Sequence, residues 1–175
     1  IIIFIYTLIF WILLPVLVLA ISYQRNFSLN LNESGSDLPV FPGVIILVFS
    51  VPLLGISIWQ YSKFSGELPV SAFPSKIIVK RGLYNYWRHP IYLFYILVLI
   101  GIAFLLRSFA MLVIVMPVFV ICTYVYILIE EELLTRRFGD AYKYYKKQTG
   151  LILPLLYQCL RYPALLIFKI LFRFK

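Results

Sequence analysis

Long apolar segments without a single charged residue alternate with polar segments along this chain of 175 residues. About 20 apolar residues in a helix are enough to cross the hydrocarbon core of a bilayer. Four segments meet or approach that length and predict membrane-spanning helices: residues 1–22, 43–61, 91–106 and 109–129.

The third and fourth of these segments are separated only by Arg107 and Ser108. So short a connection predicts an antiparallel helical hairpin. Residues 91–106 are short for a span at about 1.5 Å per residue. We therefore expect this helix to begin nearer Tyr84.

Residues 63–87 hold five charged side chains together with Pro69 and Pro74, which argue against a continuous helix. The segment is interpreted as irregular or re-entrant backbone at the membrane interface. We do not expect it to cross the bilayer.

After residue 129 the pattern becomes amphipathic, with apolar positions at helical spacing and charged positions between them. This predicts an interfacial helix over residues 130–148, broken at Gly139, with Asp140 capping its second piece. Residues 151–175 are apolar but contain cations and prolines, which favours another interfacial helix over a fifth span.

Composition supports an all-α integral membrane protein, because 63% of the residues are hydrophobic, whereas soluble domains are about half apolar. We expect a single domain over residues 1–175 with about four transmembrane helices and additional cytosolic interfacial helices.

The net charge of +9 can indicate nucleic-acid binding, but membrane topology explains it better. Fourteen of the sixteen Lys and Arg residues lie in residues 62–90 or after residue 130. The positive-inside rule makes that side cytoplasmic and, with four spans, places both termini in the cytoplasm.

Arg88-His89-Pro90 contains the only histidine and leads directly into an apolar segment. It is consistent with an ordinary helix start, where proline costs little and arginine meets lipid headgroups. The functional interpretation is that the interrupted backbone binds a polar ligand, with His89 as hydrogen-bond donor.

Glu130 and Glu131 follow an uncharged span directly, where an ionised side chain requires a partner. A cationic ligand would provide one, although a solvated helix start is the simpler alternative. Glu132 is interpreted as an ordinary pair with Arg136, four residues further on.

Aromatic residues accompany both polar segments. Tyr84 and Tyr92 either belong to an interfacial aromatic belt or form a wall against a base or a sulfonium. Tyr142 and Tyr145 are interpreted as the apolar face of the amphipathic helix. One histidine and two distant cysteines give no metal-ligand spacing, so no metal is expected.

The motifs occur in a specific order. Residues 77–84 read Ile-Ile-Val-X-X-Gly-X-Tyr, and residues 88–92 read Arg-His-Pro-X-Tyr. A hairpin follows, then Glu-Glu-Glu-Leu-Leu from residue 130, and finally Phe-Gly-Asp-X-Tyr-X-X-Tyr from residue 138. This ordered set, over roughly residues 63–154, resembles the isoprenylcysteine carboxyl methyltransferase and phospholipid methyltransferase superfamily.

The resemblance implies an integral membrane enzyme that uses S-adenosylmethionine in a cytosol-facing pocket. The methyl acceptor would be a lipid, a lipidated molecule or another hydrophobic compound that enters from the bilayer, and no catalytic residue is assigned. By position, the cofactor contacts would be Lys76, Ile77, Ile78, Val79, Tyr84, His89, Pro90, Ile91 and Tyr92, with either Glu130 or Glu131 at its polar end.

Two positions depart from the resemblance. Tyr126 is assigned to the substrate: it stands where enzymes acting on prenylated cysteine carry an arginine for the substrate carboxylate, so a free-carboxylate substrate is in doubt. Leu93 replaces a residue that is commonly small. Two other functions stay open: an NADPH-dependent enzyme related to sterol reductases, and a non-catalytic membrane binding protein.

Overall fold

The structure, a computed structural model, describes residues 16, 20, 38–67, 69 and 77–151. In that part of the chain every regular element is helical, and one isolated bridge joins Trp87 to Gly150. The elements are α4 (Val40–Ser65), the 3₁₀ turn η2 (Gly82–Asn85), α5 (Pro90–Leu105), the π-helical turn η3 (Met111–Val115), α6 (Met116–Phe138) and α7 (Asp140–Gln148). The predicted all-α class is confirmed for these residues.

Two of the described helices, Val40–Ser65 and Met111–Phe138, are long and apolar enough to cross a bilayer, whereas α5 is a shorter apolar helix. The predicted span over residues 1–22 lies outside the described residues apart from Val16 and Ala20. The interfacial helix expected over residues 151–175 also lies outside them, apart from Leu151. Four spans therefore remain a prediction.

Helix α5 begins at Pro90, so the expected start nearer Tyr84 is wrong. Proline disfavours helical backbone in the residue before it, and His89 accordingly adopts φ −127° and ψ 60°. Pro90 itself fits the first turn, where its missing N–H is not needed. Tyr84 instead belongs to the separate 3₁₀ turn.

Helix α6 continues through the three glutamates to Phe138, so the prediction of a separate helix starting at residue 130 is wrong. No glycine or proline interrupts residues 118–138, and the helix ends only where Gly139 adopts a positive φ of 56°. The predicted break at Gly139 is confirmed. Asp140 makes no capping hydrogen bond; it is the first residue of α7 and pairs with Lys143 at 2.9 Å.

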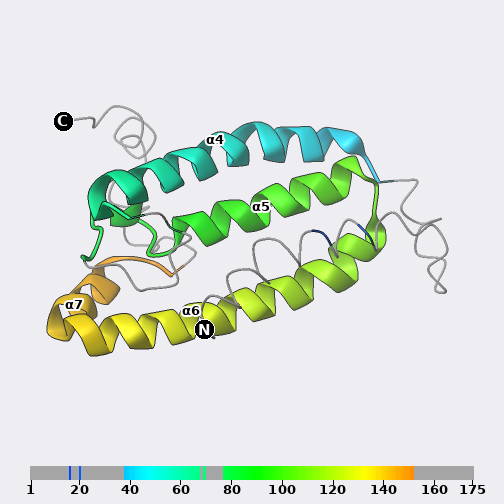
Figure 1. Cartoon of the computed structure of the whole chain (residues 1–175). Helices are drawn as coiled ribbons and strands as arrows, with labels where there is room; N and C mark the ends of the chain where they lie inside the picture. The colour runs from blue at the N-terminus through cyan, green and yellow to red at the C-terminus, as the bar shows by residue number, and fades with distance from the viewer. Residues whose placement is uncertain (1–15, 17–19, 21–37, 68, 70–76, 152–175) are drawn as a thin grey trace.

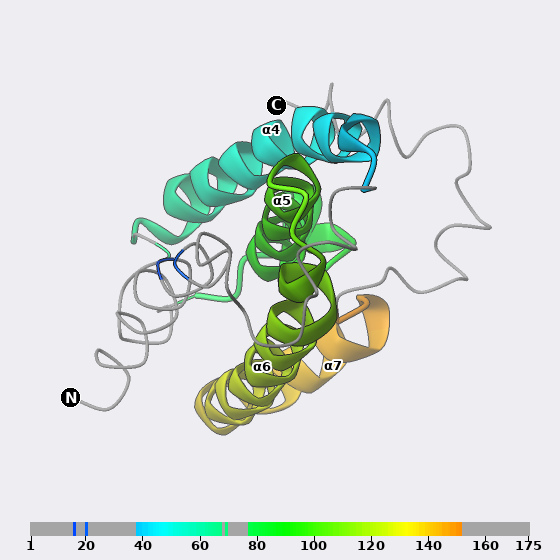
Figure 2. The ribbon, with the colours of Figure 1, turned by 90° about the vertical axis from the view of Figure 1, so that its right-hand side faces the viewer.

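Helix α5 lies between α4 and α6, as Figures 1 and 2 show from two directions. The chain reverses at Arg107 and Ser108, so α5 and α6 form the predicted antiparallel hairpin. Ser108 stabilises the reversal, because its hydroxyl accepts a hydrogen bond from the N–H of Met111 at 3.3 Å.

The hairpin is held together by a cluster of buried apolar side chains from α5, η3 and α6. Its members are Ile96, Leu99, Ala103, Met111, Met116 and Phe119. On the other side of α5, two glycines allow α4 to approach closely. A Cβ atom on Gly43 would lie 2.9 Å from the carbonyl oxygen of Gly101, and one on Gly101 would lie 2.6 Å from Cγ of Leu47. Small residues of this kind bring helix backbones together in membranes.

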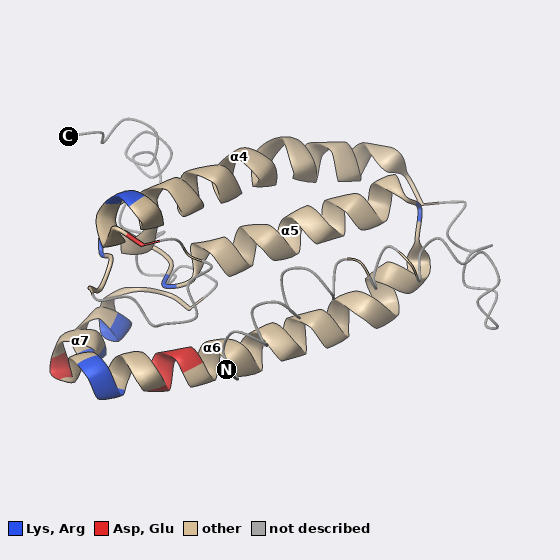
Figure 3. Cartoon of the chain, in the orientation of Figure 1, with Lys and Arg blue, Asp and Glu red and all other residues tan. Residues whose placement is uncertain are grey.

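The charged side chains of the described residues gather at one end of the helices, with Arg107 as the exception at the other end (Figure 3). That end contains the end of α4, the start of α5, the end of α6 and α7. The two polar segments that the sequence singles out, around His89 and Glu130, are therefore neighbours, and direct contacts between them confirm this.

The α4–α5 contact gives the first prediction. Gly43→Ala should destabilise the protein by about 1–3 kcal/mol, because the new methyl group meets backbone that cannot easily move. Gly55→Ala is the matched control in the same helix, since its Cβ would meet no atom within 4 Å. Thermal unfolding of both variants in detergent measures the difference, and equal midpoints would contradict the close contact.

Candidate active site

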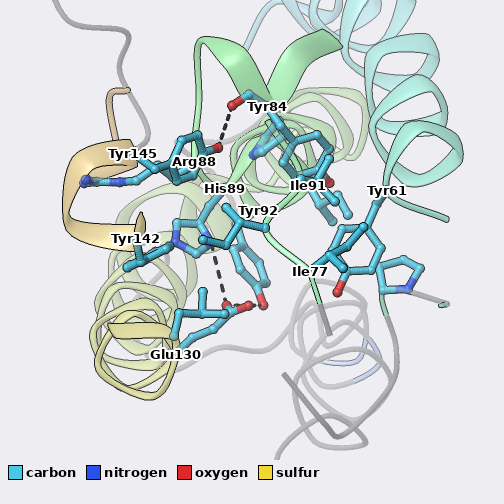
Figure 4. Close-up of a pocket in the computed structure, with 15 residues that line it drawn as sticks. Tyr61, Ile77, Tyr84, Arg88, His89, Ile91, Tyr92, Glu130, Tyr142 and Tyr145 are labelled. Carbon is cyan, nitrogen blue, oxygen red and sulfur yellow. Dashed lines mark hydrogen bonds and ion pairs between the residues drawn. The ribbon is translucent and has the colours of Figure 1, made fainter. Parts of the chain in front are cut away.

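A cleft opens at the charged end of the helices, where the segment before α5 meets the ends of α4 and α6 and the inner face of α7 (Figure 4). Its lining is mostly apolar and aromatic, with one arginine, one histidine and one glutamate. The lining residues are Tyr61, Pro69, Ile77, Ile78, Val79, Tyr84, Arg88, His89, Pro90, Ile91, Tyr92, Glu130, Leu134, Tyr142 and Tyr145.

Most of the residues expected to contact a cofactor lie in this cleft. They are Ile77, Ile78, Val79, Tyr84, His89, Pro90, Ile91, Tyr92 and Glu130. Glu131 and Tyr126 do not line it, and Lys76 lies outside the described residues. The structure thus brings the two motif segments into one cavity, although they are about 40 residues apart in sequence.

The segment before α5 is anchored to α4 by a buried glutamine. Gly82 turns the chain with a φ of 63°, and the next N–H, of Leu83, donates to the side-chain oxygen of Gln60 at 2.8 Å. The hydroxyl of Tyr84 donates to the carbonyl oxygen of Ser57, one turn earlier in α4. These bonds fix one wall of the cleft.

Helix α7 folds back over the same segment from the other side. The hydroxyl of Tyr145 donates to the carbonyl oxygen of Tyr84, and Nη1 of Arg88 donates to the carbonyl oxygen of Lys146 at 3.2 Å. Beyond α7, the N–H of Arg88 donates to the carbonyl oxygen of Gly150 at 2.9 Å. These bonds place the tyrosines of α7 in the cleft wall.

Glu130 presents its carboxylate to the cleft, with 30% of the side chain exposed. It accepts a hydrogen bond from the hydroxyl of Tyr92 at 3.1 Å, and Nδ1 of His89 lies 3.6 Å away. Among the ion pairs of the described residues, Glu130 has no lysine or arginine partner. The carboxylate can therefore accept a cationic or hydrogen-bonding group from a ligand.

Glu131, the next residue, is buried beside His89 and is surrounded by side-chain nitrogens of Lys146, Arg88 and His89. Nζ of Lys146 lies 2.7 Å from one carboxylate oxygen; Nε of Arg88 at 2.9 Å and Nε2 of His89 at 3.6 Å face the other. Glu131 lies past the uncharged part of the helix, which ends at Ile129. Burial alone would raise the pKa of its carboxyl, but His89, Lys146 and Arg88 outweigh burial and lower the pKa to about 2. Of the two glutamates that the sequence left open, only Glu130 lines the cleft.

The hydroxyl of Tyr142 is buried at the cleft and has no hydrogen-bond partner among the described residues. Burial, and then the nearby charge of Glu131, raise the pKa of Tyr142 well above its usual value, so the hydroxyl stays protonated. Burial likewise raises the pKa of Tyr145. An unpaired buried hydroxyl is costly unless a ligand supplies its partner.

Tyr126 lies one helical turn before Glu130 and contacts Tyr92 of the cleft lining. The two rings meet edge to face, with centroids 5.8 Å apart at 79°. Its predicted role at the acceptor stays a prediction.

Several lining residues were not among the predicted contacts: Tyr61, Pro69, Arg88, Leu134, Tyr142 and Tyr145. Arg88 stands beside His89 in the motif and could have been included. The sequence pattern predicts Tyr142 and Tyr145 on the apolar face of a helix, and the return of α7 makes that face a cleft wall. For Tyr61 and Leu134 the local sequence pattern does not indicate a position in the cleft.

Two helices that are long and apolar enough to cross a bilayer, with a tyrosine-rich cleft at their charged end, indicate a membrane protein. A protein-family model described as phospholipid methyltransferase matches residues 38–141, which is more than half of the chain and includes the cleft residues up to Glu130 and Leu134. The chain belongs to the phospholipid methyltransferase family, which confirms the resemblance and implies a membrane methyltransferase. Comparison with curated proteins gives no match.

The ion pairs of Glu131 give the second prediction. Glu131→Gln should lower the free energy of unfolding by about 3 kcal/mol at pH 7, since it removes the buried carboxylate that pairs with Arg88 and Lys146. Because folding lowers this pKa from 4.5 to about 2, the stabilisation is complete above pH 4.5 and is lost as the pH falls through about 2. The difference between variant and wild type should therefore shrink towards pH 2.

Glu132→Gln is the control, because Glu132 is 63% exposed and pairs only with the exposed Arg136. Chemical unfolding in detergent at pH 7, 4 and 2 gives the comparison. A loss of stability that is equal for the two variants, or that does not depend on pH, would show that the buried pairs do not stabilise the fold.

Proposed function

We propose that the chain is a membrane methyltransferase that uses S-adenosylmethionine and transfers the methyl group to a lipid, a lipidated molecule or another hydrophobic acceptor. The observation that carries the proposal is the position of Glu130. Its carboxylate lies in an aromatic cleft, without a lysine or arginine partner among the described residues, at the charged end of apolar helices.

The lining suits the parts of S-adenosylmethionine. The carboxylate of Glu130 and the ring faces of Tyr61 and Tyr84 favour cationic groups, and the cofactor carries a sulfonium and an ammonium. The apolar stretch Ile77 to Val79 offers a surface for a base, and the hydroxyl of Tyr142 offers a hydrogen-bond donor to a carboxylate or hydroxyl group. S-adenosylmethionine supplies, when bound, a methyl group on a positively charged sulfur for displacement by the acceptor.

The chain's own residues would hold, orient and enclose the reacting groups. Tyr92 donates to Glu130 and fixes the direction of that carboxylate. His89 lies between Glu130 and Glu131, with one ring nitrogen 3.6 Å from each, so its ring is held in place. Tyr142 and Tyr145 close the wall against water, which favours transfer between aligned groups. We assign no catalytic base.

The acceptor would approach from the bilayer. The outward faces of α4 and α6 are apolar and exposed, as at Val48 with 60% and Ile121 with 63% of their surface accessible. Such faces suit contact with lipid chains. No lysine or arginine occurs between Ser108 and Thr135 that could bind a free carboxylate, so an acceptor without a carboxylate group is favoured. Tyr126 and Tyr92, which are in contact, would lie on the acceptor's side of the cleft. The distribution of Lys and Arg favours a cleft that faces the cytoplasm.

An NADPH-dependent activity is less compatible with the cleft. The 2′-phosphate of NADPH needs cationic groups, but Arg88 is the one lysine or arginine among the described lining residues, and Glu131 already pairs with it. Titration with both cofactors separates the two activities.

Cofactor binding gives the third prediction. Purified protein in detergent should bind S-adenosylmethionine in calorimetry and should not bind NADPH with comparable affinity. Glu130→Gln should weaken binding about tenfold, or about 1.4 kcal/mol, because it removes a charge opposite a cationic ligand. Glu132→Gln, outside the cleft, should bind as the wild type does.

Binding by the wild type with unchanged affinity in Glu130→Gln would remove Glu130 from the site. Absence of binding would overturn the proposed cofactor. Radiolabelled methyl transfer into a total membrane lipid extract then identifies the acceptor. Transfer only to water-soluble molecules would contradict a hydrophobic acceptor.

The unpaired hydroxyl of Tyr142 gives the fourth prediction. Tyr142→Phe keeps the ring but removes the hydroxyl, and should weaken S-adenosylmethionine binding by about 1 kcal/mol, or roughly fivefold. Tyr144→Phe is the control on the same helix, because Tyr144 is 61% exposed. Equal affinities of the two variants would show that the Tyr142 hydroxyl does not meet the ligand.

A further inference from the structure

Lys146 does not line the cleft but contacts two of the segments that form its walls. Its ammonium is 2.7 Å from Glu131 on α6, and its carbonyl oxygen accepts the hydrogen bond from Arg88 in the segment before α5. One residue of α7 thus contacts both α6 and the segment before α5.

The contact between Lys146 and Glu131 is the shortest among the ion pairs of that carboxylate. Arg88 Nε is 2.9 Å from the other carboxylate oxygen, but the two atoms lack the alignment of a hydrogen bond. His89 is more distant, at 3.6 Å. Lys146 is therefore the best-placed partner that holds the Glu131 carboxylate in its position beside His89.

Helix α7 needs contacts with other elements to remain folded in this position. It has nine residues, and isolated helices of that length are not stable in water. It follows α6 across Gly139 alone, without a side-chain cap. Tyr142 and Tyr145, which line the cleft, lie four residues and one residue before Lys146.

We propose that Lys146 is a positioning residue of the cleft: by pairing with Glu131 it holds α7 against α6 and keeps His89 and the two tyrosines of α7 in the geometry that binds the ligand. The proposal rests on the proposed function for the identity of the ligand. It assigns a role in ligand binding to a side chain that does not line the site.

The neighbouring lysines of α7 differ from Lys146. Lys143 pairs with Asp140 of its own helix, and both side chains are largely exposed. Lys147 is exposed and has no ion pair among the described residues. Lys146 is 38% exposed and is paired with a residue that is 6% exposed. Lys147 is therefore a matched control for removing one positive charge from the same helix.

The test compares Lys146→Ala, Lys146→Arg and Lys147→Ala in the full chain in detergent. Calorimetry with S-adenosylmethionine should show binding about tenfold weaker for Lys146→Ala, because the cleft walls are displaced. Binding should be within about threefold of the wild type for Lys146→Arg, because arginine keeps a positive charge at this position. Lys147→Ala should bind as the wild type does.

Hydrogen exchange of the unliganded protein provides a second measurement. Lys146→Ala should accelerate exchange at the amide of Arg88, which donates to Gly150 beyond α7, whereas Lys147→Ala should not. If Lys146→Ala does not give folded protein, Lys146→Gln takes its place, because it removes the charge and retains a hydrogen-bond donor.

Equal affinity and equal exchange in Lys146→Ala and the wild type would overturn the positioning role. So would the same losses in Lys147→Ala, or no recovery in Lys146→Arg. If the wild type itself binds no S-adenosylmethionine, the proposed function fails, but exchange in the unliganded protein still decides whether Lys146 holds the cleft walls together.

Discussion

The arrangement at the charged end depends on the buried carboxylate of Glu131. An ionised group at the end of an apolar helix is stable only with partners, and here Lys146, Arg88 and His89 provide them. These partners belong to two segments, α7 and the segment before α5. Satisfying one charge therefore brings together α6, α7 and the segment before α5, and the cleft is the space between them.

Helix geometry then separates the roles of two adjacent acids. Successive residues of an α-helix point about 100° apart, so when Glu131 faces the internal cations, Glu130 faces the cleft. Tyr92 and His89 orient Glu130 without neutralising it as a lysine or arginine would. The result is a tyrosine-rich cavity that contains one glutamate, and the ion pairs of the buried Glu131 hold its walls. Membership in the phospholipid methyltransferase family is in keeping with such a site at a membrane surface.

The apolar part of the molecule supports this end by rigid packing. Gly43 and Gly101 bring α4 against α5, and the apolar cluster around Phe119 joins α5 to α6. Gln60 of α4 accepts a hydrogen bond from the N–H of Leu83 and so fixes the turn at Gly82 relative to α4. The packed helices thereby fix the positions of the segments that form the cleft.

Much of this could be predicted from local sequence, because the physical causes are local. Uncharged apolar runs predict helices, Pro90 and Gly139 predict where helices begin and end, and the charges predict which ends lie together. The continuation of α6 past Glu130 differs from the polarity pattern, which predicts a new element there, because no helix-breaking residue stands at that point.

Only the tertiary structure decided which glutamate faces the cleft and that Tyr142, Tyr145 and Tyr61 line it. The positions of Tyr142 and Tyr145 depend on the return of α7 over the segment before α5. That return is set by pairings across about 15 to 60 residues, such as those of Lys146 with Glu131 and Tyr145 with Tyr84, which no local pattern specifies.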